Sequence, residues 1–272
     1  MEEPERRVAV VGDDDRAASL REAVRAAGKR VAGVTDPDAT TTTNAEADPE
    51  STEAAASEPD ATVAVGDAAV RDALRSASGG TVIPVGTHRL AFGVDAAASR
   101  IRELLDALNS SVDGVDRVTH PVLGVDTGAS SEYRAVADVA LVTEEPARIS
   151  EFSVRFARGR EASFRADGVV VATPFGSEGY ANAAGGAVVE PGGGLSVVPI
   201  APFSTGIDAW VAAERVTLSV ERETESVALV VDGAVRETAD PSRPVEIEVI
   251  DRVEALVPTA ASALRARRSE TL

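Results

Sequence analysis

The sequence predicts an α/β N-terminal domain with an open Rossmann-like sheet, followed by a β-rich, sandwich-like C-terminal domain. Three observations support this fold class. Before Asn109, short apolar runs alternate with stretches of helical periodicity, as in open α/β sheets. After Asn109, the apolar runs are short, often alternate with polar residues and are separated by turn residues, which is typical of a sandwich. A length of 272 residues is sufficient for two domains with cores of their own.

The first elements are predicted to be strand, helix and strand. An apolar strand at Val8–Val11 leads to Asp13–Asp15, which can cap a helix, and Gly28 ends that helix before a strand at Val31–Val34. The next stretch, residues 36–60, is rich in Thr, Ala, Glu, Asp, Pro and Ser. Low hydrophobicity and like charge predict a solvated acidic loop there, for which a tolerated insertion is a simpler explanation than a regulatory role.

Alternating strands and helices resume after this loop. A strand at Ala61–Val65 precedes a helix at Ala69–Ser76, and a strand at Thr81–Val85 precedes a helix at Ala96–Leu108. In the second half, the predicted strands lie near residues 118–125, 132–143, 149–158, 161–165, 169–172, 196–200, 216–220, 227–231 and 245–249. Hairpin turns are expected at 158–160 and at Asp232-Gly233. We therefore expect boundaries near residues 108 and 255.

The composition limits the classes of partner. The formal net charge is −18, and Lys29 is the only lysine. No basic face is evident, so neither nucleic acid nor an anionic membrane is an expected partner. The acidic surplus and the scarcity of lysine indicate a cytosol of high ionic strength, as in salt-loving microbes, although an acidic protein with an acidic loop is the simpler alternative.

Other functional classes are excluded by what the sequence lacks. Without cysteine there are no disulfides, thiolate metal sites or cysteine nucleophiles. No apolar run approaches the length of a membrane span, and the N-terminus has no signal-peptide core, so we expect a cytoplasmic protein. The two histidines, His88 and His120, have no neighbouring cluster of metal ligands in the sequence. Both are expected to be ordinary loop residues, and no protein metal site is predicted.

One stretch, from Asp167 to Gly186, stands out from the rest of the chain. An apolar strand at Val169–Ala172 stops at Thr-Pro and opens into a turn of small residues, and a glycine pair precedes the next apolar run. Glycines and small hydroxyl residues let backbone N–H groups approach a ligand closely, and a row of such groups suits phosphate. Composition alone supports a tight structural loop equally well.

The same stretch resembles the signature of the NAD kinase family: Asp-Gly, a hydrophobic strand, Thr-Pro-Thr-Gly-Ser-Thr-Ala-Tyr and a Gly-Gly pair. Phe175, Glu178 and Gly179 depart from that signature. A match that contains several unrelated residue types is more specific than a lone glycine motif. The matching residues are Asp167, Gly168, Thr173, Pro174, Gly176, Ser177, Tyr180, Gly185 and Gly186.

The resemblance implies the NAD kinase/diacylglycerol kinase-like fold. The expected parts are an α/β nucleotide-binding domain (1–108, with the acidic loop 36–60), a β-rich NAD-binding domain (109–255) and a C-terminal segment (256–272) that packs back on the first domain. With the acidic composition, the chain looks like a haloarchaeal-type member. The implied reaction transfers a phosphoryl group from ATP, or polyphosphate, to the 2′-hydroxyl of the adenosine ribose of NAD, which gives NADP.

Gly66 and Asp67 are the candidate residues of the first domain. They follow the predicted strand Ala61–Val65, and ligands of α/β sheets bind outside the carboxyl ends of strands. The family has Gly-Gly-Asp-Gly here, so the resemblance implies that Asp67 accepts the proton of the ribose hydroxyl. Val65 and Ala68 replace the flanking glycines, which reduces backbone freedom. The alternative is that Asp67 simply caps the helix.

The second domain carries the remaining candidates. The family's Asn-Glu pair is Ala137-Asp138 here, so the acid is one methylene shorter and the amide is lost. By resemblance, Asp138 and Asp167 would hold the nicotinamide part of NAD, and Tyr180 would offer a flat ring to a base. Thr173, Gly176 and Ser177 complete the expected NAD site, because small residues let the substrate or its phosphates approach the backbone. The family's His in a Pro-His-Ser segment is Phe203 here.

Mg²⁺ would offset the phosphate charge, carried mainly by the nucleotide, and a homodimer or homotetramer is implied by the family alone. NAD and ATP are the expected small-molecule partners. Two alternatives remain open. One is a catalytically silent relative that binds dinucleotide as a sensor or partner subunit, and it is motivated by Val65, Ala68, Ala137 and Glu178. The other is a lipid or small-alcohol kinase with the same fold, which the long match at Thr173–Tyr180 disfavours.

Overall fold

The computed structural model describes residues 7–12, 14–31, 59–76, 80–129, 132–145, 149–204, 206–222 and 226–262. The chain forms two compact units, one of Met1–Arg117 with Glu254–Leu272 and one of Val118–Val253. The division falls within two long strands, β5 (Val115–Asp126) and β16 (Val245–Pro258), rather than in a loop. Residues 36–58 of the predicted acidic loop and residues 263–272 of the predicted C-terminal segment lie outside the described residues.

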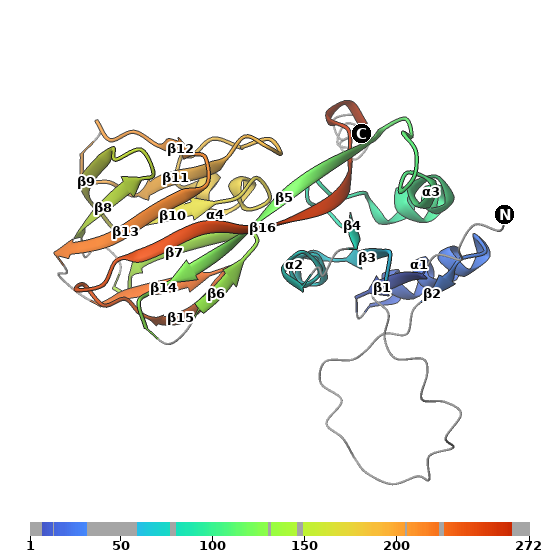
Figure 1. Cartoon of the computed structure of the whole chain (residues 1–272), viewed down its shortest axis with the longest axis horizontal. Coiled ribbons are helices and arrows are strands. Elements are labelled where there is room, and N and C mark those ends of the chain that lie inside the picture. Colours follow the sequence, from blue (N-terminus) through green and yellow to red (C-terminus); the bar gives the residue numbers. More distant parts are fainter. Residues whose placement is uncertain are drawn as a thin grey trace, which may run out of the picture. The chain divides into compact units, whose positions relative to one another are not determined.

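The first unit is an α/β sheet. Its strands are parallel in the order β2-β1-β3-β4, and β16 follows β4 through the pairing of Ala255 with Val82 of β4. The helices α1, α2 and α3 gather around these strands (Figure 1). The elements are β1 (Arg7–Val11), α1 (Asp15–Ala26), β2 (Arg30–Val31), β3 (Ala61–Val65), α2 (Asp67–Ser76), β4 (Thr81–Val85) and α3 (Val94–Asp106).

Local sequence signals explain these elements. Asp14 caps α1 because its Oδ1 accepts a hydrogen bond from the Ala17 N–H at 3.1 Å. Leu20 and Val24 lie four residues apart on one helix face and are fully buried. They join α3 and the strands β1, β3 and β4 in one apolar cluster. Beyond Val31, the predicted second strand lies outside the described residues.

The second unit is a β-sandwich. One sheet has the order β12-β11-β10-β7-β14-β15, and the other contains β16-β13-β8-β9. The apolar cluster between them takes alternate residues from nearly every strand, so one face of each strand is buried. The further elements are β6 (Glu132–Ala135), β7 (Asp138–Thr143), β8 (Ser150–Phe156), β9 (Glu161–Ala166), β10 (Gly168–Ala172), the 3-10 helix η2 (Gly176–Glu178), α4 (Tyr180–Ala183), β11 (Leu195–Ile200), β12 (Trp210–Ala212), β13 (Arg215–Arg222), β14 (Val227–Val231) and β15 (Ala234–Thr238).

The outer face of the six-stranded sheet has its own small apolar cluster. Ala140 of β7, Val170 of β10 and Val198 of β11 point to this face, and Ala181 of α4 packs on them. The short helix α4 therefore covers the face opposite the sandwich core. This arrangement holds the segment after β10 against the ends of β7 and β10. The predicted α/β first part and β-rich second part are both confirmed.

One local prediction was wrong. His120 is not a loop residue: it lies in β5, is 6% exposed, and its Nε2 lies 2.8 Å from the Val136 carbonyl oxygen. A carbonyl only accepts, so this nitrogen must donate. The ring also meets Phe175 edge-on at 6.1 Å. The His120 side chain is buried because the alternation of β5 turns it inward and a buried carbonyl accepts its N–H. A single histidine in the sequence reveals neither cause.

Candidate active site

In the first unit, the predicted acid lies at the carboxyl ends of two neighbouring parallel strands. Asp67 is the first residue of α2, directly after β3, and is exposed. A Cβ on Gly86, which follows β4, would lie 3.8 Å from Asp67 Oδ1, so the carboxylate sits beside the end of β4. Gly66, rather than Asp67, supplies the carbonyl that accepts the first helical hydrogen bond, from the Val70 N–H at 2.9 Å. Gly66 is therefore at the N-cap position, and Asp67 is an acid in the first turn of α2.

Only one glycine is needed at this turn. Gly66 has φ +89°, and its N–H donates to the Val85 carbonyl at 2.8 Å. Val65 is a buried residue of β3 that pairs with Val85, and Ala68 lies in the first turn of α2. Neither position has a positive φ. The loss of the flanking glycines is therefore compatible with the turn.

In the second unit, the motif segment after β10 is held by its own polar groups. Thr173 is fully buried, and its hydroxyl donates to the Val136 carbonyl at 2.7 Å and accepts from the Gly176 N–H at 3.2 Å. Ser177 is equally buried; its hydroxyl donates to the Pro174 carbonyl at 2.9 Å and accepts from the Val189 N–H at 2.9 Å. Both hydroxyls form hydrogen bonds that fold the loop. Both residues are predicted from the sequence to lie in the NAD site.

Gly176 is required by close packing. A Cβ there would lie 2.0 Å from the carbonyl oxygen of Ala137 and 2.4 Å from its carbonyl carbon. Both are backbone atoms, which cannot move aside as a flexible side chain can. The loop therefore packs directly against the backbone of the Ala137-Asp138 corner, where β7 begins. Sequence proximity could not have shown this contact.

Two predicted carboxylates both act on the predicted aromatic ring. Asp138 begins β7, Asp167 directly precedes β10, and Tyr180 begins α4 with 43% of its surface exposed. Burial raises the pKa of the Tyr180 phenol, and the negative charges of Asp167 and Asp138 raise it further. Asp138 pairs with Ala172 at the end of β10 and Asp167 precedes Gly168 at its start, so each acid is linked to Tyr180 rather than to the other acid.

Sequence reasoning missed one residue at this place. Asp232 was predicted only as part of a hairpin turn, and its carboxylate accepts hydrogen bonds from the backbone N–H groups of residues 136–138. The Asp-Gly pair is the sequence signal for the turn, but not for this contact. Phe203, which replaces the family's His, is 70% exposed and lies 5.5 Å below the Arg165 guanidinium.

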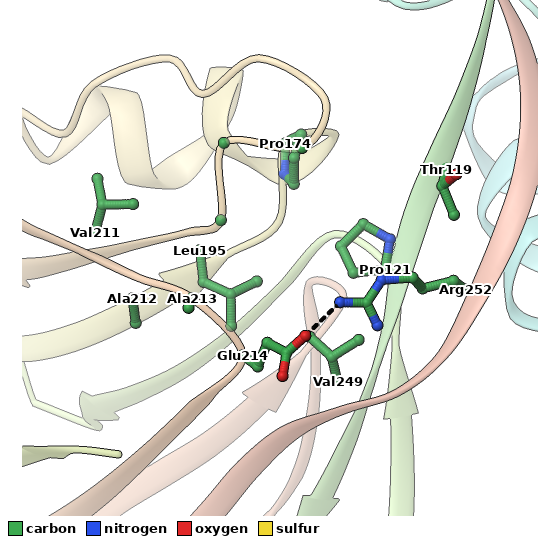
Figure 2. A pocket seen from close by; sticks show the side chains of 13 residues that line it. Thr119, Pro121, Pro174, Leu195, Val211, Ala212, Ala213, Glu214, Val249 and Arg252 are labelled. Carbon is green, nitrogen blue, oxygen red and sulfur yellow. Dashed lines mark hydrogen bonds and ion pairs between the residues drawn. The ribbon is translucent and has the colours of Figure 1, made fainter. Parts of the chain in front are cut away.

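A pocket of about 470 Å³ borders the motif loop (Figure 2). Figure 2 shows Glu214 and Arg252 pointing toward each other on its wall, and they form an ion pair at 2.6 Å. Its other lining residues are Thr119, Pro121, Pro174, Gly192, Gly193, Gly194, Leu195, Val211, Ala212, Ala213 and Val249. The carboxylates of Asp138 and Asp167 and the Tyr180 ring are not among them. Of the predicted motif, Pro174 is the residue that lines this pocket.

Within the described ranges, no group of three or more His, Cys, Asp or Glu side chains could hold a metal ion. No helix in the part of the chain that the structure describes is long and apolar enough to cross a membrane.

Residues 136–259 match the family model of the ATP-NAD kinase C-terminal domain. The NAD kinase of Methanosarcina barkeri is 35% identical over 102 residues, which are 36% of this chain and 37% of that protein. The NAD kinase of Methanoculleus marisnigri is 37% identical over 119 residues, which are 43% of this chain and 42% of that protein. The chain thus matches less than half the length of these curated relatives.

Solved structures of low sequence identity share the fold over the whole chain. An NAD kinase from Archaeoglobus fulgidus, solved in complex with ATP, superimposes with a TM-score of 0.68 at 23% identity and covers 97% of this chain and 98% of that one. Yeast NADH kinase, solved with NADH, gives a TM-score of 0.71 at 16% identity over 98% of this chain and 87% of that one.

The fold and the motif loop define a protein of two units, an α/β sheet and a sandwich of the ATP-NAD kinase C-terminal type. The family model covers residues 136–259, and the relatives that the chain matches in part are NAD kinases, so this region resembles the C-terminal domain of the NAD kinase family.

Proposed function

We propose that this protein is an NAD kinase, which transfers a phosphoryl group from ATP or polyphosphate to the 2′-hydroxyl of the adenosine ribose of NAD. The observation that carries the proposal is the motif loop after β10. This loop leads to Tyr180, which lies near Asp138 and Asp167, and it falls inside the region that matches the family model. The relatives that the chain matches in part are named NAD kinases.

The proposed chemistry assigns Asp67 the role of proton acceptor. The ribose hydroxyl gives its proton to the carboxylate, its oxygen bonds to the γ-phosphorus, and the bond from that phosphorus to the leaving oxygen breaks. An exposed carboxylate directly after a strand, beside a glycine turn, leaves room for a ribose. Gly66 would let the nucleotide approach the backbone closely.

The second unit would bind the dinucleotide. Asp138 and Asp167 would hold its nicotinamide part, and the half-exposed Tyr180 ring would stack on a base. We propose that Thr173, Gly176 and Ser177 act mainly by shaping the loop, because the two hydroxyls are bonded internally and Gly176 packs on Ala137.

Mg²⁺ is proposed as part of the substrate, bound to the phosphates of the donor. The described residues offer no cluster that would hold a resident ion. The ion would offset the charge of these phosphates. A homodimer or homotetramer, a cytoplasmic location and a high-salt cytosol stay predictions, and light scattering on the purified chain would measure the subunit number.

Replacement of Asp67 tests the function. In high salt with NAD and MgATP, the full chain should form NADP, detected with an NADP-specific enzyme. Asp67→Asn should lower turnover by about 10²- to 10⁴-fold, because the base is lost, and should leave the unfolding midpoint unchanged. Asp95→Asn is the matched control, since Asp95 is an exposed acid in the first turn of α3 in the same unit.

The outcomes of this experiment distinguish the three candidate functions. Full turnover by Asp67→Asn would remove Asp67 from the chemistry. Calorimetric binding of NAD by the unaltered protein without any NADP would indicate the silent dinucleotide-binding relative. Phosphorylation of a lipid or a small alcohol in place of NAD would indicate the third class of function.

A further inference from the structure

The turn between β14 and β15 places the carboxylate of Asp232 against the backbone of residues 136–138. Asp232 has φ +50° and Gly233 has φ +80°, the pair of positive values that a type I′ hairpin turn requires. Asp232 is one of two residues other than glycine with positive φ among the described residues. Aspartate tolerates this conformation because its short side chain can bond to nearby backbone.

Strand pairing brings this turn to the start of β7. Val231 of β14 pairs with Val139 of β7, so the next residue, Asp232, lies beside Asp138. The Asp232 N–H donates to the Asp138 carbonyl at 2.9 Å, which continues the ladder by one bond. Asp232 therefore reaches residues that are 94 to 96 positions away in sequence.

The Asp232 carboxylate then binds three successive amides. Its Oδ1 accepts from the N–H groups of Val136 at 3.1 Å, Ala137 at 2.7 Å and Asp138 at 3.2 Å. Its Oδ2 accepts from Val136 at 3.2 Å. Three amides that converge on one anion form the same kind of concavity that proteins use for phosphate. Here the chain's own carboxylate fills it.

The carbonyls of the same corner are bound from the other side. The Val136 carbonyl accepts from the Thr173 hydroxyl at 2.7 Å and lies 2.8 Å from His120 Nε2. The Ala137 carbonyl accepts from the Thr173 N–H at 2.9 Å. The corner is thus fixed through its backbone, with Asp232 holding the amides and Thr173 holding the carbonyls.

We propose that Asp232 is a positioning residue for the NAD kinase reaction: by holding the amides of residues 136–138, it sets the direction in which the Asp138 carboxylate meets the dinucleotide. Ala137 has no polar side chain that could orient this corner. The orientation of the corner therefore depends on the hydrogen bonds to its backbone. The inference rests on the proposed function. A small misplacement of a substrate-holding group weakens binding and turnover together.

Two substitutions test this role. Asp232→Gly removes the carboxylate, and glycine adopts a positive φ readily. Asp232→Asn keeps one acceptor oxygen, and asparagine also adopts a positive φ. We expect Asp232→Gly to raise KM for NAD by about ten- to a hundredfold with little change in KM for ATP, and Asp232→Asn to restore part of the loss. Hydrogen exchange of the 136–138 amides should speed up in Asp232→Gly while exchange in β10 and β14 stays slow.

Asp240 provides the matched control. It is an exposed turn aspartate of the same unit, and its Oδ1 accepts from the Ser242 N–H at 2.9 Å rather than from residues 136–138. Asp240→Gly and Asp240→Asn should leave KM for NAD unchanged. Rates are scaled to the folded fraction, measured by the fluorescence of Trp210, the only tryptophan.

The outcomes are distinct. Equal changes of KM for NAD and ATP, or unchanged exchange at 136–138, would overturn the positioning role. If the unaltered protein makes no NADP, the proposed function fails first; unaltered calorimetric binding of NAD by Asp232→Gly would then overturn the role independently of turnover.

Discussion

At the scale of single residues, Tyr180 reports on the charges of the candidate site. Its ring is partly exposed, and the charges of Asp167, between β9 and β10, and of Asp138, in β7, both act on its phenol. A deprotonated phenol would add a third negative charge to a partly desolvated place. The phenol therefore keeps its proton at physiological pH, and the ring remains neutral.

We predict that Tyr180 ionises above the ordinary value of about 10, with burial as the larger cause and Asp167 as the next. Because the pKa of the folded state is raised, the stability that this group contributes is complete below the unfolded pKa and is lost as the pH rises through the folded one. Asp167→Asn should move the ionisation back toward the ordinary value. Ultraviolet absorbance of the phenolate measures it.

The chain has two tyrosines, so Tyr133→Phe provides a background in which Tyr180 titrates alone. Glu151→Gln is the control, since it removes one negative charge from the opposite sheet of the sandwich. An unshifted titration in Asp167→Asn would contradict the proximity of the two groups.

At the scale of elements, the segment between β10 and α4 is built for close packing rather than for flexibility. Its hydroxyls and amides bond to one another and to the start of β7, and its residues from Thr173 to Ser177 are buried. Phe175 is among them, 8% exposed and packed on His120. The departure from the family's Thr at this position therefore faces the interior.

Gly176→Ala is expected to lower the free energy of unfolding by about 1–3 kcal/mol, the usual cost of forcing extra atoms into a packed place. The added Cβ meets the Ala137 backbone, so β7 must shift. Urea unfolding followed by Trp210 fluorescence measures the effect. Gly206→Ala is the control, because Gly206 is exposed and a Cβ there would lie 4.0 Å from its nearest neighbour, the Ser204 hydroxyl oxygen. Equal stability of the two variants would contradict the packing argument.

At the scale of the whole molecule, the excess of negative charge dominates. The 27 cationic side chains cannot neutralise 45 acidic ones, even if every cation is paired. The ion pairs that the described residues form are on the surface, such as Arg243 with Asp240 at 3.5 Å and Arg134 with Asp251 at 3.3 Å. Exposed pairs of this kind each contribute about 0–1 kcal/mol, so self-repulsion is not offset locally.

We predict that the thermal midpoint rises from about 0.01 M to about 1 M potassium chloride, because the Debye length falls from about 30 Å to about 3 Å. Calorimetry measures the midpoint. A variant with three exposed acids neutralised, Asp95→Asn, Asp208→Asn and Glu246→Gln, should depend less on salt. Full stability in low salt would count against a high-salt cytosol as the protein's environment.

The sequence by itself determined the pattern of elements and the motif. Helical spacing of Leu20 and Val24, alternation along the later strands and the Asp232-Gly233 turn are properties of residues close together in the chain. The signature from Asp167 to Gly186 pointed to the family and to the loop that follows β10. These features could be predicted because their causes are local.

Only the tertiary structure decided how the polar groups of the site are used. It turned the hydroxyls of Thr173 and Ser177 inward, buried His120, and brought Asp232 to amides 94 to 96 residues away. Tyr180 likewise acquires its two acidic neighbours from the ends of different strands. These contacts depend on the register in which β7 pairs with β10 and β14. That register is set by burial of a whole sheet face, and no short stretch of sequence contains it.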